Sequence, residues 1–173
     1  LPYTQYSREN LIREGIHPSK IFVVGNPIIE VINSHIKKID SSKILDKLKI
    51  KPNEYFLVTA HRSENVDDHN SLAQILDGLK KIHLKFKKKI IYPIHPRTLS
   101  KLNGKKLPKG IITVKPLGFI DFCKLEKSAL CVITDSGTVP EECLYFRKPS
   151  VTIRESTERP EYIEAGASIL SGL

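Results

Sequence analysis

The chain has 173 residues, of which 28 are Lys or Arg and 19 are Asp or Glu, so its formal net charge is +9. The 40% of apolar residues can build a sizeable core, which excludes a disordered chain, and no run reaches the roughly 18 apolar residues that a membrane-spanning helix needs. Three cysteines without a C-x-x-C pair argue against a disulfide framework and a thiolate zinc site, and they favour a reducing, cytoplasmic setting.

Short apolar runs rich in β-branched residues predict strands that are buried on both faces, because these runs do not alternate with polar residues. In chain order they are residues 21–24, 55–59, 89–93, 111–114, 130–134 and 150–153. Amphipathic stretches between them predict helices at 70–86, 119–129 and 139–146. Alternating strands and helices form βαβ units, so the sequence predicts an α/β fold with a Rossmann-like parallel sheet and helices on both faces.

Two breaks in the alternation of strands and helices predict that the chain consists of three parts. Gly25-Asn26-Pro27 closes the first apolar run, and a largely polar helical stretch follows. We expect a remnant of a preceding Rossmann-like domain over 1–26, a hinge or linker helix over 27–49, and a nucleotide-binding Rossmann-like domain over 50–173 that stops before its last helix. The chain begins at Leu1 rather than Met and shows no signal-peptide pattern, so we expect a piece of something longer.

The positive charge is concentrated in short lysine runs, at residues 80–81, 85–89 and 101–109. These runs contain Lys rather than Arg and few interleaved aromatic residues, so they indicate a solvated surface. An anionic small substrate, an anionic membrane surface and a nucleic acid are the other readings of a basic chain. We expect no nucleic acid and no membrane insertion.

The residues after each predicted strand are the candidates for a site, because ligands of parallel sheets bind at the carboxyl ends of the strands. His61 and Arg62 follow the strand ending at Thr59, with Glu64 close by. A histidine there can stabilise or protonate a phosphate leaving group, or it can belong to an ordinary turn. The His-x-x-Glu spacing also permits a metal, but no third ligand is apparent, so no metal site is predicted.

The next strand is followed by His95, which lies near Pro93 and directly before Pro96. The prolines fix the backbone and are not expected to continue a helix. His95 is therefore either a rigidly presented ligand contact or a simple loop residue.

A turn of small residues, 134–138, leads into the helix predicted at 139–146. Ser136 and Gly137 in this turn can cradle a phosphate or pyrophosphate with free backbone N–H groups. Glu142, one turn inside the helix, can accept hydrogen bonds from both hydroxyls of a ribose. The alternative is plain helix capping by Asp135 or Ser136, with the glutamates balancing the helix dipole.

Two arginines and three glutamates follow the strand at 150–153. Arg154 and Arg159 can pair with local carboxylates, or Arg159 can face the same anion as the Ser136 turn. Pro160 is expected near the first position of a short helix that Gly166 ends.

In this order, the strand-end motifs resemble the non-hydrolysing UDP-N-acetylglucosamine 2-epimerases. The matching pieces are Gly25-Asn26-Pro27, 59–65, His95-Pro96, 134–137 with Glu141-Glu142, and 157–161 with 164–166. Together they span nearly the whole chain. The resemblance implies the C-terminal half of a GT-B-type two-domain architecture, working on a UDP-sugar in the cytoplasm.

The resemblance also implies a chemistry and a set of roles. UDP is eliminated in an anti fashion to leave a glycal and then added back with C2 inverted, without a metal or a redox cofactor. Ser136 and Gly137 would hold the diphosphate and Glu142 the ribose, with Arg159 facing the same anion. His61 would act near the leaving diphosphate. Two further positions, Arg62 and His95, resemble contacts of a second, activating UDP-sugar.

Departures from the common family pattern leave the identity of the UDP-linked sugar open. Ser63 stands where the family has a second Arg, and Thr138 stands where it has a second Gly. These variants resemble the capsule and O-antigen branch, whose members act on UDP-linked 6-deoxy-N-acetyl sugars or diacetamido uronic acids. N-acetylglucosamine remains the third possible sugar.

The sequence also bears on whether the chain alone contains all the groups that the reaction needs. The carboxylates that handle the C2 proton in this family belong to the first domain, so the chain alone is expected to be inactive. Its missing N-terminal domain would be supplied in cis or in trans, and the longer form is expected to be a homodimer. The alternatives are the nucleotide-binding half of a GT-B glycosyltransferase and a stand-alone basic binding module.

Overall fold

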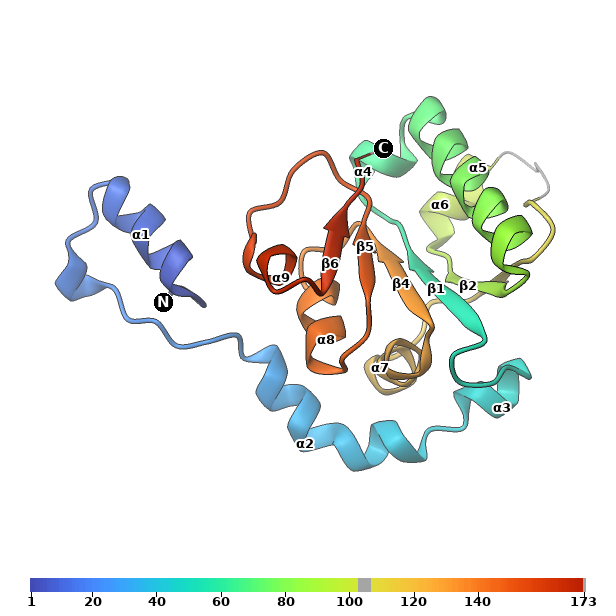
Figure 1. Cartoon of the computed structure of the whole chain (residues 1–173), viewed down its shortest axis with the longest axis horizontal. Coiled ribbons are helices and arrows are strands. Elements are labelled where there is room, and N and C mark those ends of the chain that lie inside the picture. Colours follow the sequence, from blue (N-terminus) through green and yellow to red (C-terminus); the bar gives the residue numbers. More distant parts are fainter. Residues whose placement is uncertain (103–106, 173) are drawn as a thin grey trace. The chain divides into compact units, whose positions relative to one another are not determined.

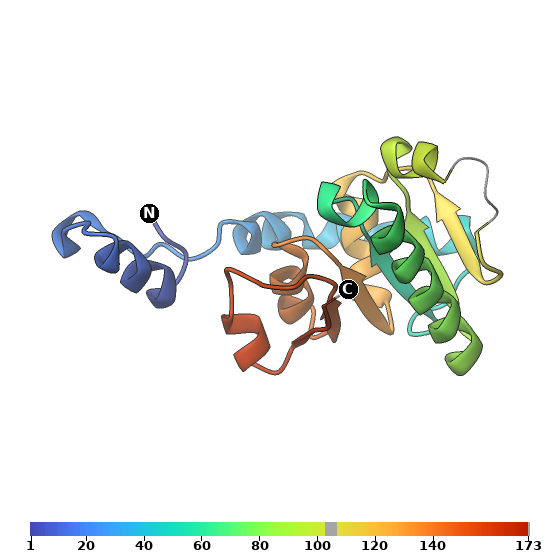
Figure 2. The ribbon, with the colours of Figure 1, turned by 90° about the horizontal axis from the view of Figure 1, so that it is seen from above.

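The computed structural model describes residues 1–102 and 107–172 (Figures 1 and 2). The chain divides into two compact units, Leu1–Lys37 and Lys38–Leu173. Part of the lysine run predicted at 101–109 lies outside the described residues. Within the described ranges, no helix is long and apolar enough to cross a bilayer.

The first unit is helical and contains no strand among its residues. Helix α1 (Gln5–Arg13) begins after Thr4, whose Oγ1 accepts the Ser7 N–H at 3.2 Å, and a single 3-10 turn, η1 (Pro18–Lys20), follows. The strand predicted at 21–24 is wrong, because Phe22 is 63% exposed and no neighbouring strand in this unit pairs with the segment. A strand needs a lateral partner for its backbone groups.

The linker predicted to be helical consists of two helices, α2 (Ile28–Ser41) and α3 (Ile44–Leu48). The boundary between the two compact units, at Lys37, falls inside α2. Helix α3 belongs to the second unit, where Ile44 enters the core. The predicted domain boundaries at 26 and 49 remain a proposal.

The second unit is built on a six-stranded parallel sheet, which confirms the predicted fold class. The strands are β1 (Tyr55–Thr59), β2 (Lys89–Pro93), β3 (Ile111–Val114), β4 (Cys131–Thr134), β5 (Ser150–Thr152) and β6 (Ser168–Leu170). Their order across the sheet is β3-β2-β1-β4-β5-β6, with all neighbours parallel. Strand β6 was not predicted, because its three residues carry no apolar run beyond Ile169 and Leu170.

Helices cover both faces of this sheet, as predicted. Helix α5 (His69–Phe86) packs Leu72 and Leu79 against one face, which includes Val58. Helices α7 (Phe119–Ser128) and α8 (Val139–Tyr145) pack against the other face, which includes Leu57. Because neighbouring residues of a strand point to opposite faces, β1 is buried along its whole length.

Three short helices complete the unit and correct details of the prediction. They are α4 (Ser63–Val66), α6 (Pro96–Lys101) and α9 (Glu161–Glu164). Pro96 begins α6 although no helix was predicted after it, because proline fits the first position of a helix. Phe86, the last residue of the helix predicted at 70–86, is 51% exposed at the end of α5. Gly166, with a φ of 69°, follows α9 as predicted.

Among the glycines of residues 1–102 and 107–172, Gly110 is expected to tolerate substitution least. Its φ is +94°, and a Cβ added there would lie 2.2 Å from Nδ1 of His83. Its carbonyl oxygen also accepts the N–H of Ile90 at the start of β2. Gly110→Ala should lower the free energy of unfolding by about 2–4 kcal/mol. The measurement is urea unfolding beside Gly78→Ala, a helical position with free space that should change by less than about 1 kcal/mol. Equal stability of the two variants would contradict the steric argument.

Candidate functional site

The candidate site lies where the strand order reverses. Strand β1 is flanked by β2 on one side and by β4 on the other, so the connections after β1 and β4 leave in opposite directions. In open parallel sheets, ligands bind outside the carboxyl ends at such a switch point. The predicted site segments 60–65 and 135–138 are the loops that follow these two strands.

Asp135 joins the two loops. It is fully buried at the end of β4, and its Oδ2 accepts the backbone N–H groups of His61 and Arg62, each at 2.8 Å. The same oxygen accepts Nδ2 of Asn65 at 3.1 Å, and this amide also donates to the carbonyl of Ile153 at 3.2 Å. One carboxylate therefore fixes the loop after β1 against the loops after β4 and β5.

His61 lies beside this carboxylate and reaches solvent. Its Nδ1 is 3.4 Å from Asp135 Oδ1 and 3.3 Å from the hydroxyl of Thr59, and its side chain is 54% exposed. A carboxylate at this distance can orient the imidazole. Arg62 points to Glu64, with Nη1 3.1 Å from Oε1. The structure therefore places His61, but not the Arg62 guanidinium, against the central carboxylate.

The turn after β4 is held by its own hydroxyls. The Ser136 N–H donates to Thr134 Oγ1 at 3.0 Å, and the Thr138 N–H donates to Ser136 Oγ at 3.3 Å. Thr138 is the residue at the N-cap of α8 and makes no side-chain capping bond, so neither Asp135 nor Ser136 caps this helix. A Cβ at Gly137 would lie 3.0 Å from Oε1 at the end of the flexible Glu158 side chain, which would have to move slightly.

Glu142 is buried below this turn, with only 7% of its surface exposed. Burial raises the pKa of its carboxyl, while hydrogen bonds with the Glu126 and Thr138 side chains act in the opposite direction. Glu126 of α7 is completely buried beside it. The ribose acceptor predicted from the sequence thus has a second carboxyl group behind it.

The two arginines after β5 differ in their surroundings. Nη2 of Arg154 is 3.0 Å from Glu158 Oε2, whereas its Nη1 is buried close to Gly137 and has no hydrogen-bond partner among the described residues. Burial acts to raise the pKa of Glu158, but hydrogen bonds and the charges of Arg154 and Arg159 hold it below its ordinary value. Arg159 instead contacts α8, with Nη1 2.8 Å from Glu141 Oε1. Both arginines thus lie beside the Ser136 turn or the helix that follows it.

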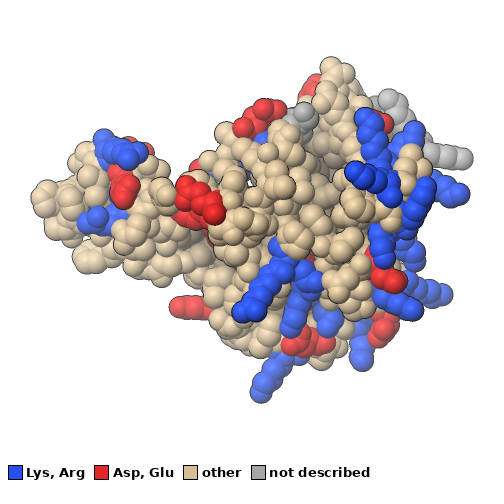
Figure 3. Space-filling model, in the orientation of Figure 1, with Lys and Arg blue, Asp and Glu red and all other residues tan. Residues whose placement is uncertain are grey.

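His95 follows β2 at the same end of the sheet as the candidate site, whereas a lysine cluster lies at the other end. His95 is exposed after β2, and its carbonyl oxygen accepts the Leu99 N–H of α6 at 3.0 Å. Figure 3 shows many separate basic side chains on the surface. A cluster of Lys49, Lys51 and residues 87–89 surrounds a hollow at the amino ends of β1 and β2, opposite the candidate site. As the sequence predicted, most of the net charge is solvated surface.

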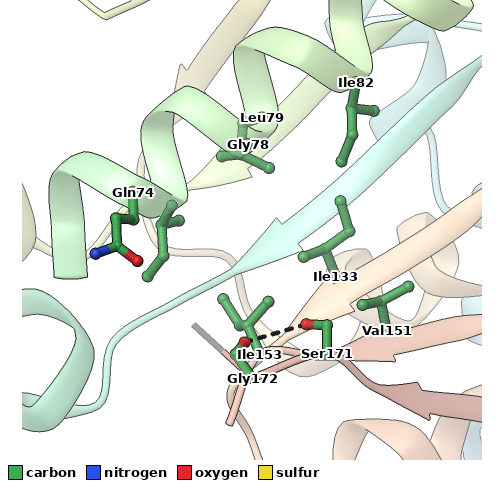
Figure 4. Close-up of a pocket in the computed structure, with 10 residues that line it drawn as sticks. Gln74, Gly78, Leu79, Ile82, Ile133, Val151, Ile153, Ser171 and Gly172 are labelled. Atoms are coloured by element: carbon green, nitrogen blue, oxygen red, sulfur yellow. Dashed lines mark hydrogen bonds between the residues drawn. The ribbon is translucent and has the colours of Figure 1, made fainter.

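Besides the lysine-lined hollow, the described residues line two cavities closer to the core and the strand ends. An apolar cavity of about 270 Å³ lies between α5 and the strands β4 and β5 (Figure 4), and it contains none of the predicted site residues. A smaller cavity of about 190 Å³ lies at the switch point and is lined by Glu64, Asn65, Arg154, Glu155 and Ser156. The chemistry-bearing groups are therefore at the strand ends.

The roles of several site residues were not predicted from the sequence. Asp135 was predicted only as a turn residue or a helix cap, yet it organises the loops. An acidic residue directly after a buried strand is the signal that could have shown this. Arg154 was predicted to pair with a local carboxylate, which its contact with Glu158 confirms, but its place close to Gly137 was not predicted. Glu126 has a signal as well, since it lies on the face of α7 that contains Cys123 and Leu125. A charged residue on such a face is buried only with a partner.

Comparison with known proteins gives consistent matches. The family model for UDP-N-acetylglucosamine 2-epimerase matches residues 1–173. A UDP-N-acetylglucosamine 2-epimerase of Methanocaldococcus jannaschii is 40% identical over 178 residues, covering 98% of this chain and 49% of that protein. The corresponding protein of Methanococcus maripaludis is also 40% identical, with the same coverage.

Solved structures agree with the sequence matches. The M. jannaschii UDP-GlcNAc 2-epimerase in complex with UDP-GlcNAc and UDP has a TM-score of 0.89 and 38% identity. The match covers 98% of this chain and 49% of that one. The Rickettsia bellii enzyme has a TM-score of 0.90 and 36% identity, with coverages of 98% and 46%. The chain therefore spans about half the length of the relatives that it matches.

Proposed function

Because the chain belongs to the UDP-N-acetylglucosamine 2-epimerase family, we propose that it is the UDP-binding half of an enzyme that epimerises C2 of a UDP-linked N-acetyl sugar. The observation that carries this proposal is the buried Asp135, which holds the loops after β1 and β4 together at the switch point. This arrangement brings His61 next to the turn of Ser136 and Gly137. A histidine, a small-residue turn and a buried glutamate are groups that can bind a nucleoside diphosphate.

Each group has a task in the proposed site. The Ser136 hydroxyl and the N–H of Gly137 would donate to diphosphate oxygens, and the missing Cβ of Gly137 lets the anion approach the backbone. Arg159 would add positive charge from its place beside Glu141. Glu142 would accept hydrogen bonds from the ribose hydroxyls, which a carboxylate can do with both oxygens.

The reaction is redox-neutral. A proton leaves C2 while the bond between C1 and the UDP oxygen breaks, which forms a C1=C2 double bond and free UDP. UDP then adds back to C1 and C2 receives a proton on its opposite face. His61 would stabilise or protonate the diphosphate as it leaves, and the groups that move the C2 proton would lie in the half that this chain lacks.

The finer identity of the reaction rests on sequence variants. Ser63 and Thr138 favour the branch that makes capsule or O-antigen sugars, a cytoplasmic pathway step, and Arg62 and His95 would contact a second, regulatory UDP-sugar. The complete enzyme would act as a homodimer. An exchange assay in heavy water distinguishes this proposal from the alternative, the nucleotide-binding half of a glycosyltransferase. The chain completed with its missing half should introduce deuterium at C2 of the UDP-sugar, whereas sugar transfer without exchange would contradict an epimerase.

Glu142→Ala should weaken UDP binding by roughly 1–3 kcal/mol, because the ribose would lose charge-assisted hydrogen bonds. Isothermal titration of the 173-residue chain with UDP measures this, and Ser136→Ala in the same titration tests the diphosphate contact. Glu54→Ala is the control, since Glu54 is exposed and directly precedes β1 at the opposite end of the sheet. If Glu142→Ala binds UDP like the control, Glu142 does not hold the ribose.

A further inference from the structure

Glu126 is a buried acid for which the reaction described above has no use. None of its surface is exposed, and among the residues that the structure describes no N–H or hydroxyl group donates to its carboxyl oxygens. The polar groups beside them are the Glu142 carboxyl and the Cys123 thiol. An isolated carboxylate in such a place costs several kcal/mol in lost hydration. The residue therefore needs either a counter-charge or a proton.

The groups around Glu126 provide no counter-charge. The carboxyls of Glu126 and Glu142 and the thiol of Cys123 place one polar atom each within 4.8 Å of one another. The other titratable groups coupled to these residues are Tyr55 of β1 and, from α8, Glu141 and Cys143. The lysines of α7 turn elsewhere, because Lys124 and Lys127 both contact Asp40.

Two carboxyl groups in contact cannot both be ionised, so they share a proton. Burial and the neighbouring Glu142 raise the pKa of Glu126 well above its ordinary value. The deeper carboxyl, Glu126, therefore keeps the proton, and Glu142 at the edge of the site stays the acceptor. A proton between the two also supplies the hydrogen bond that the oxygens of Glu126 otherwise lack.

We propose that Glu126 is a positioning residue for Glu142: it remains protonated and donates a hydrogen bond that fixes the Glu142 carboxylate for the ribose of UDP. This inference rests on the proposed function, because it assigns Glu142 to the ribose. The same chain of contacts continues to the diphosphate turn, since Thr138 hydrogen-bonds Glu142 and its hydroxyl is 3.3 Å from that of Ser136. The buried proton would thus orient both parts of the nucleotide site.

The first test is the pH dependence of folding. Glu126 has a raised pKa in the folded chain, so folding takes up a proton above the ordinary pKa of glutamate. Its stabilising contribution is complete below that pKa and is lost as the pH rises towards the folded value. Between pH 5 and 8, the melting temperature of the wild-type chain should therefore fall relative to that of Glu126→Gln, which carries no proton to lose. Glu54→Gln removes an exposed carboxyl and should follow the wild type.

The second test is UDP affinity by isothermal titration. Glu126→Gln keeps a donor for Glu142 and should bind UDP within about twofold of the wild type. Glu126→Met has a similar length but no donor, and its Kd should rise roughly tenfold or more. A purely structural role predicts instead that both variants bind alike, because either side chain fills the space between α7 and α8.

The outcomes separate this inference from the function on which it rests. If the wild-type chain does not bind UDP, the proposed function fails. If Glu142→Ala loses affinity while Glu126→Met keeps it, only the positioning role of Glu126 is overturned. The same holds if the wild type and Glu126→Gln show parallel pH profiles. If the wild type, but not Glu126→Gln, releases a stoichiometric metal ion, a cation occupies the place of the shared proton. This outcome would also overturn the positioning role of Glu126.

Discussion

Asp135→Ala is expected to lower the free energy of unfolding by about 3–5 kcal/mol, because it removes one buried acceptor from several donors at once. Asp135 is fully buried, and the N–H groups of His61 and Arg62 and the amide of Asn65 all donate to its Oδ2. Asn65 is itself 1% exposed, so water cannot easily replace the lost oxygen. The loop after β1 should detach from β4, and UDP binding should be lost together with stability.

Urea unfolding measures the effect, with Asp77→Ala as the matched control. Asp77 is on the surface of α5, where Lys81 pairs with it one turn away, and its side chain is 53% exposed. Removal of this carboxylate should change stability by less than about 1 kcal/mol. Asp135→Asn keeps one side-chain oxygen, so its loss of stability should lie between those of Asp135→Ala and Asp77→Ala. A loss for Asp135→Ala no greater than that for Asp77→Ala would show that Asp135 does not hold the loops together.

The second large effect concerns turnover. The 173-residue chain alone should epimerise UDP-N-acetylglucosamine at a rate at least about 10³-fold below that of the chain completed by its missing half. The reason is that the chain spans about half of its relatives and, in our proposal, contributes the UDP site without the groups that move the C2 proton. Proton NMR in heavy water follows both C2 exchange and the new epimer.

The matched comparison adds the missing half, fused or as a separate polypeptide, and repeats the assay with His61→Ala. Restored exchange that depends on His61 would support the division of labour between the halves. Turnover by the purified chain alone would contradict it, because the whole reaction would then proceed at this strand-end site.

The sheet could be predicted from the sequence because its strands are short β-branched runs between amphipathic helices. Strands β1, β2 and β3 were predicted with their observed bounds. The strand predicted at 21–24 was wrong because an apolar run does not reveal whether a partner strand exists. Conversely, β6 escaped prediction because pairing with β5, and not its own composition, makes it a strand.

The site was predictable only in part, for a similar reason. The positions of His61, Ser136 and Gly137 follow from the rule that ligands bind at the carboxyl ends of strands. The contact between Glu126 and Glu142 joins two helices, and no local pattern contains it. The acceptor role of Asp135 likewise depends on the adjacency of β1 and β4, which the sequence does not show. Long-range pairing thus decides which strand-end groups meet.

The most direct test of the central proposal is a UDP titration of the ¹⁵N-labelled chain followed by its amide NMR spectrum. Our account predicts that the amides of Ser136, Gly137 and Thr138 shift most, together with those of His61 and Glu142 around them. The exposed lysines at 87–89, at the other end of the strands, should change little. Shifts concentrated on those lysines, with the amides of 136–138 unmoved, would contradict a UDP site at the ends of β1 and β4.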